Sequence, residues 1–328
     1  MRSVTARSLA LGLVLLAGCK PEPFRPDAGP IRWSPKPGEI LDWDIQLART
    51  PFDVSTMRAM YMIDLFDAVP AATMLDYGDG APLTVPAGAH ATAIAQLHAT
   101  TPPTIVVCHV NSGAIRLTDP DAIKYPGYEA NPPNRQTLPD SHPAPGSVIG
   151  WSTSETDSNE RFIDMGDGAR DKVLPLVERR IELAKRIGCD AIAANLNDAV
   201  AYESTIGHGF DPIKPEVLTS WATEVTKRAH DREISIGVRN SRQQTIDAEA
   251  PAYDWALVDR CGEYDECDKQ QPFINRHKAV FAIDYDTMED GSSSNTAAVV
   301  CGMQAAAQIA GGIIKTAALD SSYRMPCP

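Results

Sequence analysis

Short apolar segments alternate with helical patterns along most of this 328-residue chain, and this alternation restricts its possible folds more than any other feature. Segments of strand length and composition occur at 41–45, 59–65, 104–110, 190–196, 234–238, 255–258, 279–283 and 312–317. Helical spacing of apolar residues covers 169–187, 214–232 and 295–310. Strands that alternate with helices form parallel sheets. Eight such strands predict an α/β fold, a (β/α)8 TIM-like barrel in one domain.

An open, doubly wound sheet is the alternative fold. Such a sheet usually carries a glycine-rich phosphate-binding turn after its first strand, and this sequence has none there. Two segments depart from the alternation, 68–101 and 120–146, and the second contains seven prolines. It follows the third strand directly, on the face where barrel active sites lie. We therefore interpret it either as a lid or substrate wall, or as a surface loop.

The first residues have the pattern of an export signal. Arg2 and Arg7 precede an apolar run at 9–16 and the small residues Ala17 and Gly18. The run is too short to span a bilayer. Residues 16–19 resemble the lipobox of bacterial lipoproteins, which implies cleavage after residue 18 and lipidation of Cys19; the alternative is an ordinary secretory signal. By the same resemblance, Lys20 favours the outer membrane or cell surface of a Gram-negative bacterium.

The remainder of the chain divides into two parts. Residues 19–39 contain six prolines and predict a semi-rigid tether, and residues 40–328 form the predicted barrel domain. Loss of residues 1–18 would remove two of the 30 basic residues and none of the 43 acidic ones, so the net charge would change from −13 to −15. This charge argues against nucleic acid as a partner and favours attraction of a cationic polymer.

Six cysteines follow Cys19, and an even number in an exported chain permits disulfides. Six cysteines allow 15 pairings, of which Cys261 with Cys267 is the one we favour. A zinc site is less favoured, because these two cysteines lack CxxC spacing and no histidine cluster lies nearby. We expect no metal and no cofactor.

Several segments together resemble glycoside hydrolase family 114, the endo-α-1,4-polygalactosaminidase family. They follow the family's order at residues 43–47, 61–67, 108–113, 160–164, 188–190, 237–240, 261–267 and 279–285. The resemblance implies a TIM-like barrel that cleaves α-1,4-linked, galactosamine-rich polysaccharide. Free amines make this polymer cationic, which suits an acidic protein.

The resemblance also locates the catalytic carboxyl groups. Glycosidases use two carboxyl groups across the scissile bond. In this family they come from an Asp that ends the fourth strand and a Glu just before the cysteine that ends the sixth. Here Asn195 occupies the first position and Asp259 the second. An amide has no proton to exchange, and Asp is one methylene shorter than Glu. The resemblance therefore implies weakened or lost hydrolysis, unless Asp198 and Asp259 form a rearranged pair.

Further residues are candidates for substrate contact. Arg239 and Asp284 replace a family Lys and Glu, Tyr264 could stack on a sugar, and Asp64 and Asp164 lie at strand ends. The two strand-end acids could instead bond backbone amides or cap a helix. His109 is expected to be a pocket or core residue. A further departure is Met62, where the family has an Asp.

Three functions remain open at this stage. The first is a surface-anchored glycoside hydrolase with an altered carboxylate pair. The second is an inactive relative that binds amino-sugar polysaccharide, and the third is a structural component of the outer membrane. The expected partners are a polysaccharide and, through the lipid anchor, a membrane.

Overall fold

The computed structural model describes residues 32–130, 143–153, 159–196, 209–210, 213–241, 244–289, 291 and 296–327. The predicted signal peptide, Cys19 and Asp198 lie outside the described residues. Among the described residues, no helix combines the length and the apolar character that a membrane span requires.

The main sheet contains eight parallel strands that follow one another in chain order. Each predicted strand segment matches one of them, so the α/β prediction is confirmed. The strands are β1 (Trp43–Gln46), β2 (Met60–Asp64), β5 (Ile105–Asn111), β9 (Ala191–Asn195), β10 (Ser235–Arg239), β11 (Trp255–Asp259), β12 (Val280–Tyr285) and β13 (Ile313–Lys315).

The sheet curls into a nearly closed barrel. A short strand, β14 (Arg324–Pro326), pairs antiparallel with β13, and within the described ranges no backbone ladder joins β13 or β14 to β1. Side chains connect these edges instead. The Trp43 indole donates to the carbonyl of Gly311 at 2.6 Å, and the Arg324 guanidinium donates to the carbonyl of Trp43 at 2.7 Å. Buried Lys315 pairs with Asp44 at 2.9 Å.

Alternate residues of the strands fill the barrel interior. One apolar cluster contains Ile45, Met62, Val107, Leu257 and Ile283, all at most 1% exposed. The other set of alternate residues belongs to a larger cluster that faces the helices. This division follows from the period of two in a strand, and it decides which side chains at the strand ends face the barrel mouth.

The start of the chain's described part closes the bottom of the barrel. The Trp33 ring lies 5.7 Å from Trp255 and 6.4 Å from Phe281, centroid to centroid, and the carbonyl of Pro35 accepts a hydrogen bond from the Ala279 amide. The predicted tether boundary at residue 39 is therefore too late. Its prolines suggested an extended spacer, but packing of half-buried Trp33 and burial of Pro35 hold residues 33–35 against the barrel domain.

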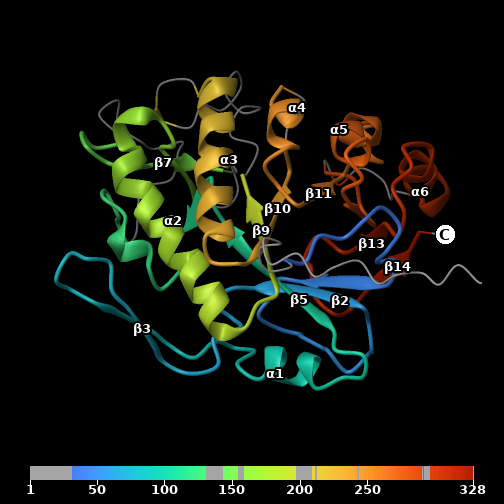
Figure 1. Cartoon of the computed structure of the whole chain (residues 1–328), viewed down its shortest axis with the longest axis horizontal. Coiled ribbons are helices and arrows are strands. Elements are labelled where there is room, and N and C mark those ends of the chain that lie inside the picture. Colours follow the sequence, from blue (N-terminus) through green and yellow to red (C-terminus); the bar gives the residue numbers. More distant parts are fainter. Residues whose placement is uncertain are drawn as a thin grey trace, which may run out of the picture. The chain divides into compact units, whose positions relative to one another are not determined.

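Helices pack outside the sheet (Figure 1). The three predicted helices correspond to α2 (Asp167–Ile187), α3 (Pro215–His230) and α6 (Ala297–Ala306). Gly188 ends α2 in a left-handed conformation (φ 97°), which glycine adopts without strain. Shorter helices are α1 (Ala93–His98), α4 (Ile246–Glu249), α5 (Gln271–Ile274) and the 3-10 turns at Ala122–Lys124 and Cys267–Gln270. No described helix follows β1 or β13, so strict eightfold alternation is not met.

Two small antiparallel sheets account for much of the irregular sequence. One is the hairpin β3 (Thr73–Leu75) and β4 (Leu83–Val85). The other joins β6 (Ala114–Arg116), β8 (Glu160–Ile163) and β7 (Ile149–Ser152) in that order. It is inserted between β5 and α2, and Figure 1 shows β7 beside the upper parts of α2 and α3, the end towards which β9 points. The insertion therefore lies at the carboxyl ends of the barrel strands.

The segment 120–146 is partly core. Asp121 and Tyr125 are at most 1% exposed and pack against Arg180 of α2. Residues 131–142 lie outside the described part. For residues 120–130, burial against α2 replaces the lid interpretation.

Three disulfides join the six cysteines: Cys108–Cys189, Cys261–Cys267 and Cys301–Cys327. The favoured pair is confirmed. The first links β5 to Cys189, two residues before β9, and the second ties the loop that follows β11, directly beside the barrel mouth.

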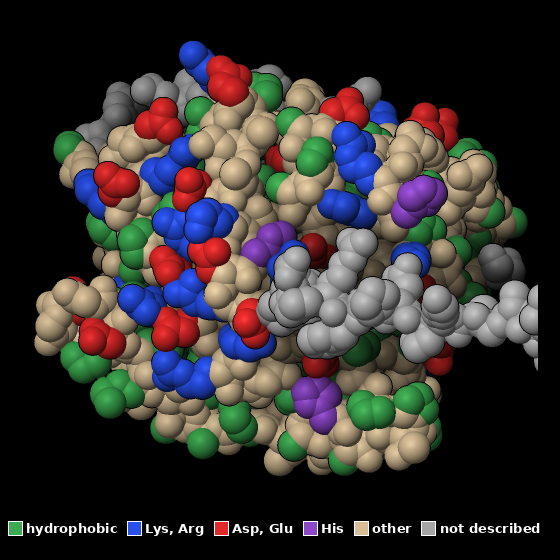
Figure 2. Space-filling view, in the orientation of Figure 1, with side chains coloured by type: hydrophobic (Ala, Val, Ile, Leu, Met, Phe, Trp, Pro, Cys, Tyr) green, Lys and Arg blue, Asp and Glu red, His purple; other side chains and the backbone are tan. Residues whose placement is uncertain are grey.

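Acidic and basic side chains are interspersed on the face that carries α2 and α3 (Figure 2). Glu178 pairs there with Arg228 at 3.1 Å and with Arg232 at 2.5 Å. On this face, acidic side chains thus have basic neighbours, although the chain as a whole carries a net negative charge.

Candidate active site at the barrel mouth

Asp259, the last residue of β11, points into the barrel mouth with its carboxylate held by three donors. Arg239, the last residue of β10, donates through Nε to Oδ1 at 3.0 Å and through Nη2 to Oδ2 at 2.5 Å. The Tyr285 hydroxyl donates to Oδ2 at 2.7 Å. The side chains of Arg239 and Asp259 are only 8% and 14% exposed. A bidentate guanidinium in such a site fixes the carboxylate geometrically.

Neighbouring groups hold this clamp in place. The Arg260 guanidinium stacks 4.4 Å from the centroid of the Tyr285 ring. Arg260 has a left-handed backbone (φ 59°), a strained conformation for a side chain of this size. Burial and the neighbouring Asp259 raise the pKa of Tyr285, so the phenol keeps its proton and remains a donor. Burial opposes the charge of Arg239, but Asp259 outweighs it and raises the Arg239 pKa.

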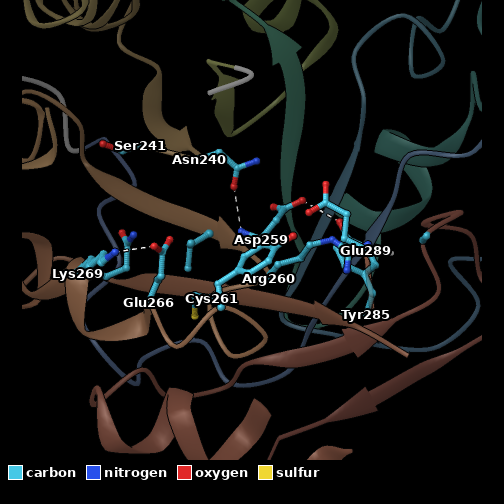
Figure 3. Close-up of a pocket in the computed structure, with 13 residues that line it drawn as sticks. Asn240, Ser241, Asp259, Arg260, Cys261, Glu266, Lys269, Tyr285 and Glu289 are labelled. Atoms are coloured by element: carbon cyan, nitrogen blue, oxygen red, sulfur yellow. Dashed lines mark hydrogen bonds and ion pairs between the residues drawn. The ribbon is translucent and has the colours of Figure 1, made fainter. Parts of the chain in front are cut away.

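A polar cavity of about 310 Å³ opens above Asp259 (Figure 3). Asn240, Glu266, Lys269 and Glu289 line it together with Tyr264, which is 46% exposed. The Asn240 side chain accepts the Asp259 amide at 2.9 Å. The cavity thus combines a fixed carboxylate, further acidic groups and an exposed aromatic ring, the components of a sugar-binding pocket.

His109 connects this cavity with the opposite side of the mouth. It lies on β5, and its Nε2 is 3.1 Å from Nη1 of Arg239. A guanidinium offers only donors, so Nε2 is the acceptor and the proton is on Nδ1. Burial, reinforced by Arg239, lowers the pKa of His109 well below its usual range. His109 is therefore a neutral positioning group, in agreement with the predicted pocket or core role.

The opposite side of the mouth contains Asp64, at the end of β2. One of its oxygens accepts the amides of Phe66 and Asp67 at 3.0 and 3.3 Å, and the other pairs with Arg116 at 2.5 Å. A cavity of about 490 Å³ adjoins this pair and is also lined by Asp67 and Asp119. The backbone-bonding interpretation of Asp64 is therefore correct, and its carboxylate also lines the wall of a cavity.

Asn195, at the end of β9, is 8% exposed and connects to a carboxylate that our sequence analysis assigned no role. Its Nδ2 donates to Oδ1 of Asn111 at 3.3 Å. Nδ2 of Asn111 in turn donates to Oε1 of Glu160 at 2.8 Å, and the Thr153 hydroxyl lies 3.0 Å from Oε2. The inserted sheet thus connects Glu160 through Asn111 to Asn195 at the end of β9.

Two predicted contacts are placed elsewhere. Asp284 is fully buried and points outward, because Ile283 and Tyr285 on either side of it face inward. Its carboxylate accepts the amides of Gly262 and Glu263 and the Gln304 side chain, so it supports the loop after β11 and does not face the mouth. Asp164 accepts the amide of Gly166 at 2.8 Å just before α2 and lines a different cavity. This is the backbone-bonding alternative, since no described side chain caps α2.

Of the predicted residues, Asp259 and Tyr264 line one pocket, and Arg239 binds Asp259 from outside the pocket lining. Asn195 and Asp64 lie at the same end of the barrel strands. The sequence analysis missed Glu160, Tyr285, Asn111 and Arg116. Only Tyr285 had a local signal, since it shares the inward parity of Phe281 and Ile283.

A nearly closed α/β barrel with a clamped carboxylate at the carboxyl ends of its strands is the arrangement of many glycoside hydrolases. The family model of glycoside-hydrolase family GH114 matches residues 25–327, and the chain belongs to this family. No curated protein sequence matches the chain significantly.

Comparison with solved structures supports the fold. Aspergillus fumigatus Ega3, crystallised with galactosamine, is 22% identical, with a TM-score of 0.62 over 90% of this chain and 97% of Ega3. A GH20 module of the pneumococcal exo-β-D-N-acetylglucosaminidase StrH is 10% identical, with a TM-score of 0.48 over 87% of this chain and 81% of that module. The second likeness is too distant to carry an argument.

Proposed function

We propose that this protein hydrolyses α-1,4-linked, galactosamine-rich polysaccharide at the barrel mouth, with the sheet acting as a (β/α)8 TIM-like barrel. The observation that carries the proposal is the Asp259 carboxylate, fixed by Arg239 and Tyr285 in a polar pocket of a GH114 chain. The galactosamine named in the Ega3 structure supplies the substrate class. The acidic groups on both sides of the mouth would favour a polymer with free amines.

The role of Asp259 follows from its partners. Both Arg239 nitrogens are donors only, so a proton on Asp259 would cost one of these contacts. Asp259 therefore acts as the charged carboxylate, which stabilises positive charge at the anomeric carbon by attack or by removal of a proton from the attacking water. The proton for the leaving oxygen must come from a second group.

The test uses the purified chain and an α-1,4-galactosamine polymer with free amines, alongside the same polymer after full N-acetylation. We expect reducing ends to be released from the free-amine polymer and more slowly from the acetylated one, because acetylation removes the positive charge. Retention of the polymer in a pull-down without any release at high protein concentration would favour the alternative, an inactive relative that binds amino-sugar polysaccharide.

We further propose that the chain is exported and anchored through a lipid on Cys19. Its disulfide content, three bridges among residues 108–327, is usual in oxidising compartments. Labelled fatty acid should be incorporated by the parent chain and not by Cys19→Ser. Equal labelling of both chains would contradict the anchor.

A further inference from the structure

Hydrolysis at this mouth needs a proton donor, and Asn195 cannot provide one. An amide does not exchange a proton with the leaving oxygen. Asp259 is engaged as an acceptor by Arg239 and Tyr285. The reaction therefore needs another titratable group on the Asn195 side of the mouth.

We propose that Glu160 supplies this proton, as a catalytic acid carried by the inserted sheet in place of the carboxyl group missing at position 195. The proposal rests on the proposed hydrolase function. Glu160 is the first residue of β8, and its carboxylate connects through Asn111 to Asn195. The residue is half-buried.

The contacts of Glu160 suit a group that gains and loses a proton. A threonine hydroxyl can donate to a carboxylate or accept from a carboxylic acid, so the Thr153 contact survives both states. The Asn111 amide donates to Oε1, which remains an acceptor when the proton is on Oε2.

Asn195 itself favours this arrangement. Its Nδ2 donates to Oδ1 of Asn111, which leaves the Asn111 amino group directed at Glu160. An aspartate at position 195 would be an acceptor and would compete with Glu160 for that amino group. Asn195, which replaces the family Asp, therefore orients the Asn111 side chain. The Asn111 amide in turn holds the Glu160 carboxylate.

Electrostatics place Glu160 near the reacting region. Asp259 is the larger influence, but Glu160 also raises the pKa of Arg239, the residue that clamps Asp259. Glu160 also contributes to the raised pKa of Arg116, although Asp64 contributes more. The charge of Glu160 thus acts on arginines in both halves of the mouth.

The chemistry balances with one water. The Glu160 proton passes to the glycosidic oxygen as the bond from this oxygen to the anomeric carbon breaks. Asp259 either forms an ester with the anomeric carbon, which water then hydrolyses, or removes a proton from the water that attacks directly. Water adds a hydroxyl group to the anomeric carbon. In the ester route its other proton returns to Glu160; in the direct route Asp259 takes this proton and releases it to solvent, from which Glu160 is protonated again.

The test compares the parent chain with Glu160→Gln, Asp198→Asn and the control Glu216→Gln, whose carboxylate is exposed at the start of α3. We expect Glu160→Gln to lower the rate of polymer hydrolysis by about 10²- to 10⁴-fold and to remove the limb of the pH profile that reports the acid. Polymer binding in a pull-down should be retained, and Glu216→Gln should match the parent.

A dinitrophenyl α-galactosaminide separates catalysis from structure, because its leaving group needs no proton. Glu160→Gln should cleave it within about tenfold of the parent rate, whereas a merely structural role would lower both activities together. Two results would overturn the assignment of Glu160. The first is a Glu160→Gln variant that cleaves polymer as fast as the parent chain. The second is a larger loss of polymer hydrolysis in Asp198→Asn than in Glu160→Gln. A parent chain that cleaves neither substrate overturns the proposed function itself.

Discussion

Replacement of Asp259 by Asn is expected to lower the rate of polymer hydrolysis by about 10³-fold or more, while the fold is kept. The amide cannot form the ester, accept a proton from water or carry the charge that stabilises the anomeric carbon. The change preserves size, so the Arg239 and Tyr285 side chains keep a polar neighbour. Rates of reducing-end release at saturating polymer, compared with the parent chain, measure the effect.

The matched control is Asp247→Asn, an exposed carboxylate on α4 outside the mouth. It should leave the rate unchanged. Thermal unfolding of both variants distinguishes lost chemistry from lost structure. An Asp259→Asn protein that is folded and retains a tenth or more of the parent rate would show that Asp259 is not the charged carboxylate of the reaction.

The largest expected effect on stability is that of Arg180→Met. Arg180 is 1% exposed and donates from Nε and Nη2 to Asp121 at 2.8 and 2.7 Å, and from Nη2 to Asp119 at 3.1 Å. Burial raises the pKa of Asp119 although Arg180 opposes it. Without the guanidinium, buried Asp121 loses its ionic partner, and buried Asp119 keeps only Arg116. We expect the free energy of unfolding to fall by about 3–5 kcal/mol.

Arg179→Met is the matched control, since Arg179 precedes Arg180 in α2. Arg179 pairs with Glu182, and both side chains of this pair are 33% exposed. A pair of this kind contributes about 0–1 kcal/mol. Denaturant unfolding of both variants gives the two values. Equal losses would contradict the view that the buried pair anchors residues 119–125 to α2. Arg180 also donates to the Asn111 carbonyl at 3.2 Å, so its loss should disturb the residue that holds Glu160.

The barrel strands could be predicted because each is a buried apolar run with a clear boundary. The insertion β6, β8 and β7 could not, because its strands have three or four residues and β6 pairs with β8 across a long stretch of sequence. The tether was predicted too long for a similar reason. Its prolines are a local signal, whereas the packing of Trp33 against Trp255 depends on the assembled barrel.

The site was predictable where one strand end carries the chemistry, as with Asp259 and Arg239. That Asp259 and Arg239 pair with each other became visible only in the structure, where β10 and β11 are neighbouring strands. Strand parity could have excluded Asp284, because Ile283 belongs to the interior cluster. Glu160 carried no such signal, since it reaches the mouth from a strand outside the barrel and through the Asn111 side chain.

The most direct test of the account is a crystal structure of Asp259→Asn with a galactosamine oligosaccharide bound. We expect the sugar chain to cross the mouth, with the glycosidic oxygen about 3 Å from a Glu160 oxygen and the anomeric carbon about 3–3.5 Å from the residue 259 side chain or from a water bound to it. An oligosaccharide bound elsewhere, such as the cavity beside Asp164, or across the mouth with Glu160 out of reach of that oxygen, would contradict it.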